Sequence, residues 1–390
     1  MTAGITLPPG VAETLIALRR DLHRYPELAF EEHHTATRIE EALCAVPGVS
    51  VQRVAGTGLV GRLRGQSDAE PVVAIRGDID ALPIQESTGV SWASERPGVM
   101  HACGHDVHAA WTVGAAHLLA ADPPPHDVLF VLQPAEETGR GALAMLETGA
   151  LDGVTAIVGA HVDMRFPVGT VVAEAGPIAG STDEFRIDVI GRGGHAARPH
   201  EAHDPIVAAA AIVVALQAIV ARRLPPGEPG VLTVGMFHGG TAPNVIPDRV
   251  ALAGTLRAVT GTTRAVLQRE LTQTAEAVAA AHNVDAHVIV TPGTPPIVNA
   301  PGPVAWAREA VTSLLGPQAL VLLPTVNLGG EDFAFYLERI PGCFLRIGAG
   351  GGGEPVAAHT SRFLPEEGAI AVGAAVLAET ARRAAAGCVR

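Results

Sequence analysis

The sequence predicts an α/β protein in which a smaller α+β domain is inserted into a larger domain with a mostly parallel sheet and helices on both faces. Three observations lead to this prediction. Apolar runs typical of buried strands alternate with helical patterns over the first half of the chain. The order of elements changes after residue 180 and returns to the earlier style after residue 293. The length of 390 residues suits two domains better than one.

The larger domain, 1–180 and 294–390, is predicted from periodicity and from the residues that stop each element. Apolar positions recur at helical spacing over 11–23 and 33–46. A third helix begins near Asp106 and ends where Asp122 is followed by three prolines. The other predicted elements are strands at 71–76, 128–132, 156–160 and 343–347, and helices at 139–148, 302–316 and 366–387.

The inserted segment, 181–293, has the order strand, helix, strand, strand, helix, strand, which is the ferredoxin-like arrangement. Its predicted elements lie at 185–190, 205–222, 231–237, 250–258, 262–282 and 286–291. The run from Ile206 to Val220 is the most apolar long segment, but it contains Gln217 and is too short to cross a bilayer. We therefore expect a buried helix there.

Composition excludes several classes of function. A net charge of −13 and a pI near 5.6 argue against nucleic acid or an anionic membrane as partner. The sequence opens without a charged-then-apolar leader, and its four cysteines form no short-spaced pair, so we expect a cytoplasmic protein with free thiols. The chain contains no lysine, which excludes a P-loop lysine, a Schiff-base lysine and a Ser-x-x-Lys nucleophile.

Two short segments carry side chains of the kinds that bind divalent metals. Cys103 and His105 flank a glycine at a predicted strand-to-helix junction. Glu136 and Glu137 follow an apolar strand and a proline, at the carboxyl end where open α/β sheets bind ligands. A free cysteine is commonly a small core residue, and paired carboxylates commonly cap a helix. The context favours a metal site, with Glu137 as ligand and Glu136 as general base beside an activated water.

Further candidates follow other predicted strands. His161 comes directly after the strand 156–160, and His359 follows the glycine-rich loop 348–353. Asp78 and Asp80 close another strand, where one of them would orient a metal-bound imidazole, although an aspartate-rich turn is an equal alternative. His108 lies one helical turn beyond His105 and suits either a ligand or a structural role. Other histidines are expected to be surface or packing residues, namely His23, His33, His34, His117 and His126.

Taken together, these motifs resemble the amidohydrolase branch of the dinuclear metallo-aminoacylase and carboxypeptidase family. That branch includes hippurate hydrolase, N-acyl-amino-acid amidohydrolases and plant auxin-conjugate hydrolases. The resemblance covers nearly the whole chain in the right order. It lies in Asp21-Leu-His-Arg-Tyr-Pro-Glu27, Gly77-Asp-Ile-Asp-Ala-Leu-Pro83, His101-Ala-Cys-Gly-His-Asp106, Glu136-Glu-Thr-Gly139, Gly193-Gly-His-Ala-Ala-Arg-Pro-His200, Gly239-Gly-Thr-Ala-Pro-Asn-Val-Ile-Pro247 and Gly329-Gly-Glu-Asp-Phe-Ala-Phe335.

The resemblance implies two divalent metal ions per subunit, with zinc, manganese, cobalt and nickel as candidates. It implies that Glu136 acts as general base and acid, and that the ions are held by Cys103, His105, Glu137, His161 and His359. Within the insertion, a lid and dimerisation domain, His195 would stabilise the oxyanion from the partner subunit. Asn244 and Arg257 would contact the substrate carboxylate, and Asp80 would orient a metal-bound histidine.

The predicted reaction is hydrolysis of the amide bond of N-acyl-L-amino acids by a metal-bridging hydroxide, in a homodimer or a tetramer. Two alternatives stay open: a dipeptidase or carboxypeptidase of the same family, and a non-catalytic ligand-binding homologue. More distant peptidases of the family have a histidine where this chain has Asp78, which leaves the role of that residue open.

Overall fold

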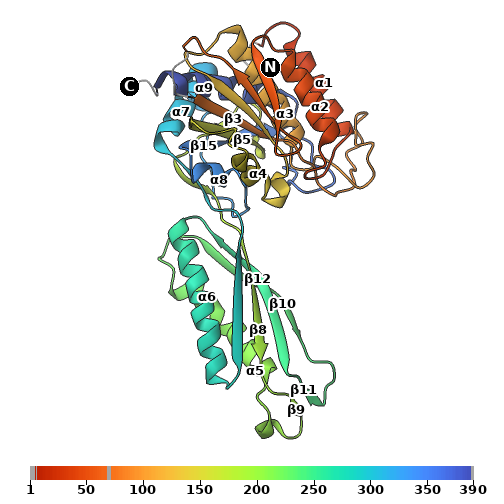
Figure 1. The fold of residues 1–390 in the computed structure, drawn as a ribbon, viewed down its shortest axis with the longest axis vertical. Coiled ribbons are helices and arrows are strands. Elements are labelled where there is room, and N and C mark those ends of the chain that lie inside the picture. The colour runs from red at the N-terminus through yellow and green to blue at the C-terminus, as the bar shows by residue number, and fades with distance from the viewer. Residues whose placement is uncertain (1–4, 6, 68–71, 388–390) are drawn as a thin grey trace. The chain divides into compact units, whose positions relative to one another are not determined.

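The computed structural model describes residues 5, 7–67 and 72–387, and the chain forms two compact units (Figure 1). The first unit comprises the described residues up to Gly176 together with Val298–Pro324 and the residues from Asp332 onward. The second unit comprises Pro177–Ile297 and Thr325–Glu331. Residues 325–331 fall outside the insertion predicted from the sequence. They belong with the second unit because, for example, the Gly180 N–H donates to the Asn327 carbonyl at 2.8 Å.

The first unit contains a seven-stranded sheet in the order β1-β2-β4-β3-β5-β15-β6. The four central strands β4, β3, β5 and β15 are parallel to one another, and β1, β2 and β6 pair in antiparallel fashion at the edges. Central parallel strands are covered on both faces, which explains their continuous apolar sequence. The strands are β1 (Val49–Val54), β2 (Gly58–Leu63), β3 (Val72–Asp78), β4 (Val128–Gln133), β5 (Val154–Pro167), β6 (Val171–Val172) and β15 (Gly342–Gly350).

Helices cover both faces of this sheet. On one face α3 and α9 pack against each other and against β3, with the buried ring of Trp111 next to Gly373, and α1 packs on α3 where Leu15 lies against Gly114. On the other face, Arg76 of β3 points toward Phe333, which directly precedes α8, and α8 contacts α4. The helices are α1 (Val11–Arg24), α2 (His33–Cys44), α3 (His105–Ala121), α4 (Gly141–Glu147), α7 (Pro301–Leu315), α8 (Ala334–Leu337) and α9 (Gly368–Gly387), with short 3-10 turns η1 (Glu136–Thr138) and η3 (Pro317–Ala319).

The second unit is a four-stranded antiparallel sheet in the order β10-β12-β8-β13, with α5 and α6 packed against it. The chain order and the strand order together give the ferredoxin-like arrangement. Its core includes Phe185, Ile212, Leu252 and Leu271. The elements are β8 (Asp183–Ile190), β9 (Gly194–His195), η2 (Pro199–Glu201), α5 (Pro205–Arg222), β10 (Gly230–Gly239), β11 (Val245–Ile246), β12 (Arg249–Ala258), α6 (Gly261–Ala281) and β13 (Asp285–Pro292). Two further strands lie where the chain passes between the units, β7 (Gly176–Ala179) and β14 (Ile297–Asn299).

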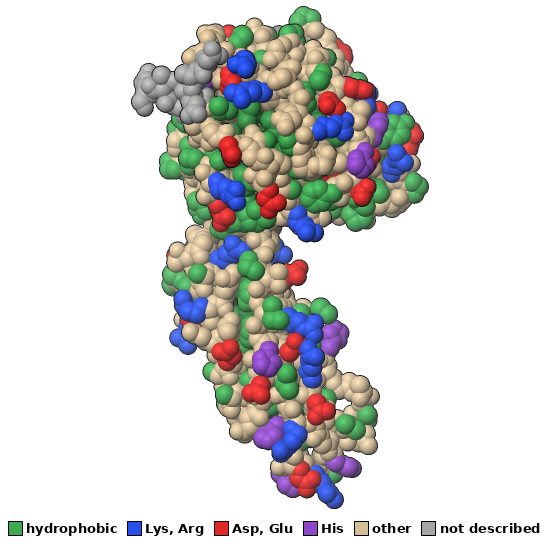
Figure 2. All heavy atoms as spheres, viewed as in Figure 1, with side chains coloured by type: hydrophobic (Ala, Val, Ile, Leu, Met, Phe, Trp, Pro, Cys, Tyr) green, Lys and Arg blue, Asp and Glu red, His purple; other side chains and the backbone are tan. Residues whose placement is uncertain are grey.

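By length and composition alone, α5 would be able to cross a membrane. It packs on the sheet with Ala208, Ile212 and Leu216 buried, but its outer face is also apolar. The expected buried helix is therefore buried on one face only. The core helix of a globular domain passes the same test of composition. On the face seen in Figure 2, acidic and basic side chains are interspersed over both units, in keeping with the scattered charges of the sequence.

Candidate metal centre

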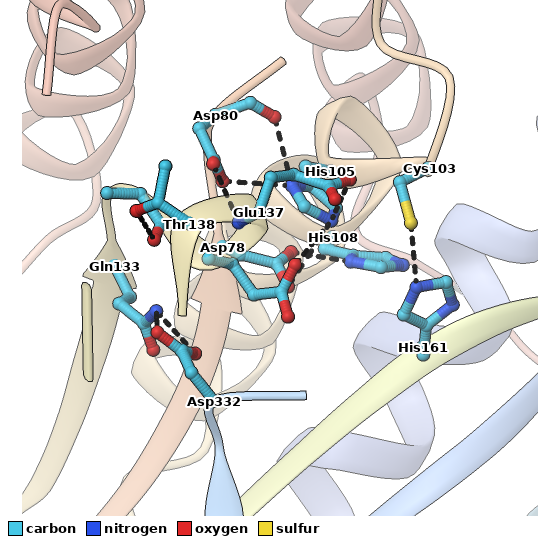
Figure 3. A network of polar contacts seen from close by, with 12 residues as sticks. Asp78, Asp80, Cys103, His105, His108, Gln133, Glu137, Thr138, His161 and Asp332 are labelled. Atoms are coloured by element: carbon cyan, nitrogen blue, oxygen red, sulfur yellow. Dashed lines mark hydrogen bonds and ion pairs between the residues drawn. The ribbon is translucent and has the colours of Figure 1, made fainter. Parts of the chain in front are cut away.

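The carboxyl ends of the central strands of the first unit hold a cluster of buried metal-ligand side chains (Figure 3). The chain runs from β3 through α3 to β4 on one side, and then crosses to β5 on the other side of β3. Such a switch in direction leaves room for a ligand beyond the strand ends. The loop before α3, the turn after β4 and the strand β5 therefore meet beside the end of β3.

Cys103 and His105 enter the cluster from the loop that leads into α3. Gly104 between them has φ of +97°, and a Cβ at this position would lie 2.6 Å from Val162 Cγ2, so only glycine fits. The Cys103 Sγ lies 3.2 Å from His161 Nε2. His105 Nδ1 donates to Asp80, at 2.9 Å from its carbonyl and 3.1 Å from Oδ1. This hydrogen bond leaves His105 Nε2 as the lone-pair nitrogen, and that atom is buried without a hydrogen-bond partner in the described part of the chain.

His161 lies inside a strand rather than after one, which corrects the predicted end of β5 at residue 160. The strand continues to Pro167 because β15 pairs with it along its length. On its other side, pairing with β3 ends at Arg76 and Gly159. His161 therefore stands just past the last β3 pairing, at the same edge of the sheet as the other candidates. Its Nδ1 donates to the Val162 carbonyl at 2.7 Å, so Nε2 is the lone-pair nitrogen, and this nitrogen faces the Cys103 sulfur.

Glu136 and Glu137 form the turn η1 directly after β4. The Glu137 N–H donates to Asp80 Oδ2 at 3.0 Å, and its Oε1 lies 3.4 Å from His359 Nε2 and 3.9 Å from His105 Nε2. Glu136 Oε2 lies 3.8 Å from His105 Nε2. The His359 N–H donates to the Ala102 carbonyl at 2.8 Å, which ties its loop to the segment that carries Cys103.

The predicted ligands fall into groups whose donor atoms lie within 4.8 Å of one another. One group is Cys103, His105 and His161, another is Cys103, Glu137 and His359, and a third is His105, Glu136 and Glu137. The groups overlap, and together they contain all five predicted ligands and the predicted base. One thiol, three imidazoles and a carboxylate are a donor set that suits zinc and other first-row metals.

The electrostatics of the cluster fit a cation. Burial lowers the pKa of His105, but the Asp78 carboxylate and the bond to Asp80 outweigh burial and raise it well above its ordinary value. Burial and the Glu137 carboxylate raise the pKa of the Cys103 thiol to about 12. The shift at His105 shows that the neighbouring carboxylates favour positive charge at this ring. At His161, burial and the neighbouring His108 and Arg346 lower the pKa well below its ordinary value, which keeps the ring neutral as a metal ligand requires. A bound cation would reverse the shift at the thiol, because a coordinating thiol is deprotonated.

His108 has no nitrogen left for a metal, which answers the question that the sequence left open. Its Nδ1 donates to Asp78 Oδ1 at 2.6 Å, and its Nε2 accepts from the Val162 N–H at 3.0 Å. The ring also stacks on Trp111 with centroids 4.6 Å apart. His108 is therefore a brace between β3 and the strand that carries His161.

Sequence reasoning missed Arg76, a fully buried cation in β3. Its guanidinium donates to Asp78 Oδ2 at 2.6 Å, to Gln133 Oε1 at 2.8 Å and to Asp332 Oδ1 at 2.9 Å. The arginine thereby links β3, β4 and the segment before α8. It also binds Asp78 Oδ2, whereas His108 binds Oδ1 of the same carboxylate. The available signal was an arginine at the end of an apolar strand, directly before the two aspartates of Gly77-Asp-Ile-Asp80.

The predicted residues of the second unit are divided between two places in it. His195 on β9 pairs with Val245 on β11, and the Ala196 N–H donates to the Asn244 carbonyl at 3.2 Å, so His195 and Asn244 are neighbours. Arg257 lies on β12 eight residues beyond Arg249, a distance of about 26 Å along a strand. The fold thus brings His195 and Asn244 together and leaves Arg257 at the opposite end of the strand.

Comparisons with known proteins all match this chain to hydrolases. A model of peptidase family M20/M25/M40 matches residues 74–383. N-acetyl-L-cysteine deacetylase of Bacillus subtilis is 40% identical over 377 residues, covering 95% of this chain and 88% of that protein. IAA-amino acid hydrolase ILR1-like 2 of Arabidopsis thaliana is 40% identical, covering 87% of this chain and 78% of that protein. The crystal structure of a dinuclear metal-binding M20 peptidase of Bacillus subtilis has a TM-score of 0.86 and 36% identity, covering 96% of this chain and 98% of that chain.

Proposed function

The chain belongs to peptidase family M20/M25/M40, and on that premise we propose that it hydrolyses the amide bond of N-acyl-L-amino acids. The products would be a carboxylic acid and a free amino acid. The observation that carries this proposal is the convergence of buried ligand atoms and of Glu136 at one edge of the sheet. The names of the relatives, which describe a deacetylase and an amino acid hydrolase, support an acylated amino acid as substrate.

Two divalent ions belong to this proposal, and five side chains would hold them. Those side chains are Cys103, His105, Glu137, His161 and His359. When bound, the ions supply Lewis-acid polarisation of the scissile carbonyl and activation of a water molecule. Asp80 contributes by fixing both His105 and the Glu137 backbone, so that two donors face the same space. Zinc suits the thiolate and imidazoles, and manganese, cobalt and nickel accept the same donors.

Glu136 is the proposed general base and acid. Its carboxylate takes a proton from the attacking water as the water oxygen bonds to the carbonyl carbon. The same proton then passes to the leaving nitrogen as the C–N bond breaks, which releases the amine. Glu136 is buried, with 9% of its surface exposed, whereas the neighbouring ligand His359 is the solvent-facing member of the cluster at 54%.

His195 and Asn244 are proposed to act on the substrate from the second unit. Both residues are exposed and lie side by side, so both side chains are accessible to a substrate. The His195 imidazole would stabilise negative charge that develops on the carbonyl oxygen only in the transition state. Asn244 would contact the substrate carboxylate. Arg257 lies at the far end of β12 from His195. The two residues of one subunit would therefore not contact the same substrate, and Arg257 would have to come from the other subunit.

We propose a homodimer that associates through the second unit, so that His195 serves the partner's site. Within the described sheet, β10 is an edge strand with Met236 52% and Phe237 43% exposed. The outer face of α5 adds Val207 and Val214, which are 53% and 73% exposed. An apolar edge strand beside an apolar helix face favours pairing with another copy. A tetramer would need a second interface in addition.

A peptidase that accepts dipeptides or releases carboxyl-terminal residues is the second candidate, because the solved relative is named a peptidase. The two candidates differ in whether the substrate carries a free amino terminus.

The proposal is tested by loading the protein with zinc, manganese or cobalt and assaying N-acetyl and N-benzoyl amino acids beside matched dipeptides. Turnover of the acylated series above the dipeptides is the expected result. Turnover of dipeptides alone would support the peptidase, and no turnover of either series with any metal would contradict both.

A further inference from the structure

Glu32 is a fully buried carboxylate at the start of α2 that does not cap its own helix. An acid at this position normally accepts hydrogen bonds from the first turn. Here Glu27 has that role, because its side chain accepts from the His34 N–H at 3.1 Å and the Thr35 N–H at 2.9 Å. The side chain of Glu32 turns away from α2, so its burial needs another explanation.

The Glu32 side chain contacts the residue directly before the proposed base. Its Oε1 accepts from the Ala135 N–H at 2.9 Å, and its Oε2 accepts from the Thr57 hydroxyl. Ala135 and Glu32 are 103 positions apart in the chain, so this contact joins the start of α2 to the end of β4. A buried carboxylate is costly, and an apolar side chain would fill the same space at less cost. The carboxylate therefore has a use that an apolar residue would not supply.

Ala135 has a backbone conformation that alanine disfavours. Its φ of 54° and ψ of 37° lie in the left-handed region, where only glycine has no steric penalty. The reversal at Ala135 sets the direction of η1, because its carbonyl accepts from the Gly141 N–H at 3.2 Å and from the Thr138 hydroxyl at 3.0 Å. Whatever holds Ala135 in this conformation also aims Glu136 and Glu137.

We propose that Glu32 is a positioning residue for this turn: by accepting the Ala135 N–H it holds Ala135 left-handed and fixes the directions of Glu136 and Glu137. The inference rests on the proposed function for the roles of those two glutamates. It adds a second buried carboxylate contact to that of Asp80, which binds the Glu137 N–H. The turn is then held at the residue that precedes it, Ala135, and at its second residue, Glu137.

The test uses matched substitutions. Glu32→Met keeps the length of the side chain and removes the acceptor, whereas Glu32→Gln keeps an oxygen that can accept the Ala135 N–H. Glu27→Met is the control. It removes the carboxylate that accepts from the first N–H groups of α2, and among the described residues this carboxylate makes no hydrogen bond to η1. Ala135→Gly supplies a residue that adopts the left-handed conformation freely, and it should therefore rescue Glu32→Met.

Two readouts do not depend on turnover: amide hydrogen exchange of the segment around Ala135 in metal-free protein, and the affinity for Co²⁺ followed by its absorption spectrum. We expect Glu32→Met to speed exchange in that segment and to weaken Co²⁺ binding by about 10- to 100-fold, the range seen when a residue that orients a ligand is lost. Glu32→Gln and Glu27→Met should stay within about threefold of wild type in Co²⁺ affinity, a factor worth less than 1 kcal/mol. The double variant Glu32→Met, Ala135→Gly should recover most of the lost affinity.

The inference is overturned if Glu32→Met leaves both exchange and Co²⁺ affinity unchanged, or if Ala135→Gly adds no recovery. In the second case Glu32 would only stabilise the fold, as Glu27 does. If Glu32→Met does not fold, the same comparison is made between Glu32→Ala with and without Ala135→Gly, because alanine also removes the acceptor. A gain in Co²⁺ affinity on adding glycine supports the inference, and no gain contradicts it. A wild type that binds Co²⁺ but cleaves no acylated amino acid would remove the proposed reaction and leave both readouts of Glu32 valid.

Discussion

The candidate ligands of the first unit and the candidate substrate contacts of the second unit are held in opposite ways. His105 is buried, and Asp80 fixes both its Nδ1 and the Glu137 backbone. His195, by contrast, is exposed on a two-residue strand, with Asn244 exposed beside it. The comparison supports a cation site that is largely built in advance, with His359 as its exposed member at 54%, and it fits the proposal that His195 acts only in a closed or paired state.

The largest effect is expected from Glu136→Gln, which removes the proposed base and keeps the shape of the side chain. Turnover should fall by about 10²- to 10⁴-fold, because no group is left to transfer the proton. The metal content, measured by elemental analysis, should not change, since Glu136 is not among the five proposed ligands. Unchanged turnover would show that another group moves the proton.

His195→Ala should lower turnover by about 10²- to 10³-fold, the usual cost of losing one oxyanion donor. Its metal content and its melting temperature should match those of wild type, because the side chain is exposed in its own unit. Mixing Glu136→Gln and His195→Ala subunits tests where the histidine acts. Mixed dimers should regain part of the activity if the histidine serves the partner's site, and no recovery would indicate that it serves its own subunit.

Asp80→Ala should have an intermediate effect, centred on metal binding. Removing its carboxylate frees the His105 ring and the Glu137 N–H together, so we expect a loss of about 10- to 100-fold in metal affinity. Isothermal titration with zinc measures this loss. An affinity equal to that of wild type would mean that packing alone orients His105, and the contrast between the units would then weaken.

The smallest effect concerns pH and a histidine outside the site. His23 is fully buried, with Nδ1 2.9 Å from Asp106 and Nε2 3.3 Å from Glu86. Burial lowers the pKa of His23, but the two carboxylates outweigh burial and raise it above its ordinary value. Its stabilisation is therefore complete below the unfolded-state pKa of about 6.5 and is lost as pH rises through the folded-state pKa.

Urea unfolding across the neutral and alkaline range measures this loss. The free energy of unfolding should decline with rising pH in wild type, and the decline should be smaller in His23→Gln. An identical slope in both proteins would remove His23 as the cause. A smaller decline in His23→Gln, the expected result, would show that buried ion pairs contribute to the stability of the first unit in addition to its metal ligands.

Much of the fold followed from patterns that lie within short segments. The helices α1, α3 and α5 and the central strands β3, β4 and β15 were predicted within a few residues, because each shows its own period or an unbroken apolar run. The predicted end of β5 was wrong by seven residues, because the strand continues past its apolar run to Pro167. The strands β1 and β2 were not predicted. β1, at the edge of the sheet, has mostly exposed and half-buried positions and so shows no buried run. β2 is mostly buried, but Gly58, Gly61 and Arg62 interrupt its apolar residues.

The candidate site divides in the same way. Cys103 and His105 were predicted from their motif, although the structure has a loop and no strand directly before them. The glutamate pair was predicted because it follows the apolar strand β4. Arg76 and Glu32 were missed, since each acts through partners far away in the sequence, at Asp332 and at Ala135. A single sequence gives no sign of which distant residue a buried charge will meet. Only the folded chain shows that these two charges support the turn and strands around the ligands.

The central claim is that five donors between positions 103 and 359 hold two cations beside Glu136. Anomalous X-ray diffraction from zinc-loaded crystals tests it most directly, because each zinc gives its own peak. The account predicts two peaks, with the Cys103 sulfur at about 2.3 Å and histidine nitrogens at about 2.0–2.1 Å from them. Peaks placed elsewhere, or a cluster that takes up no metal, would contradict it.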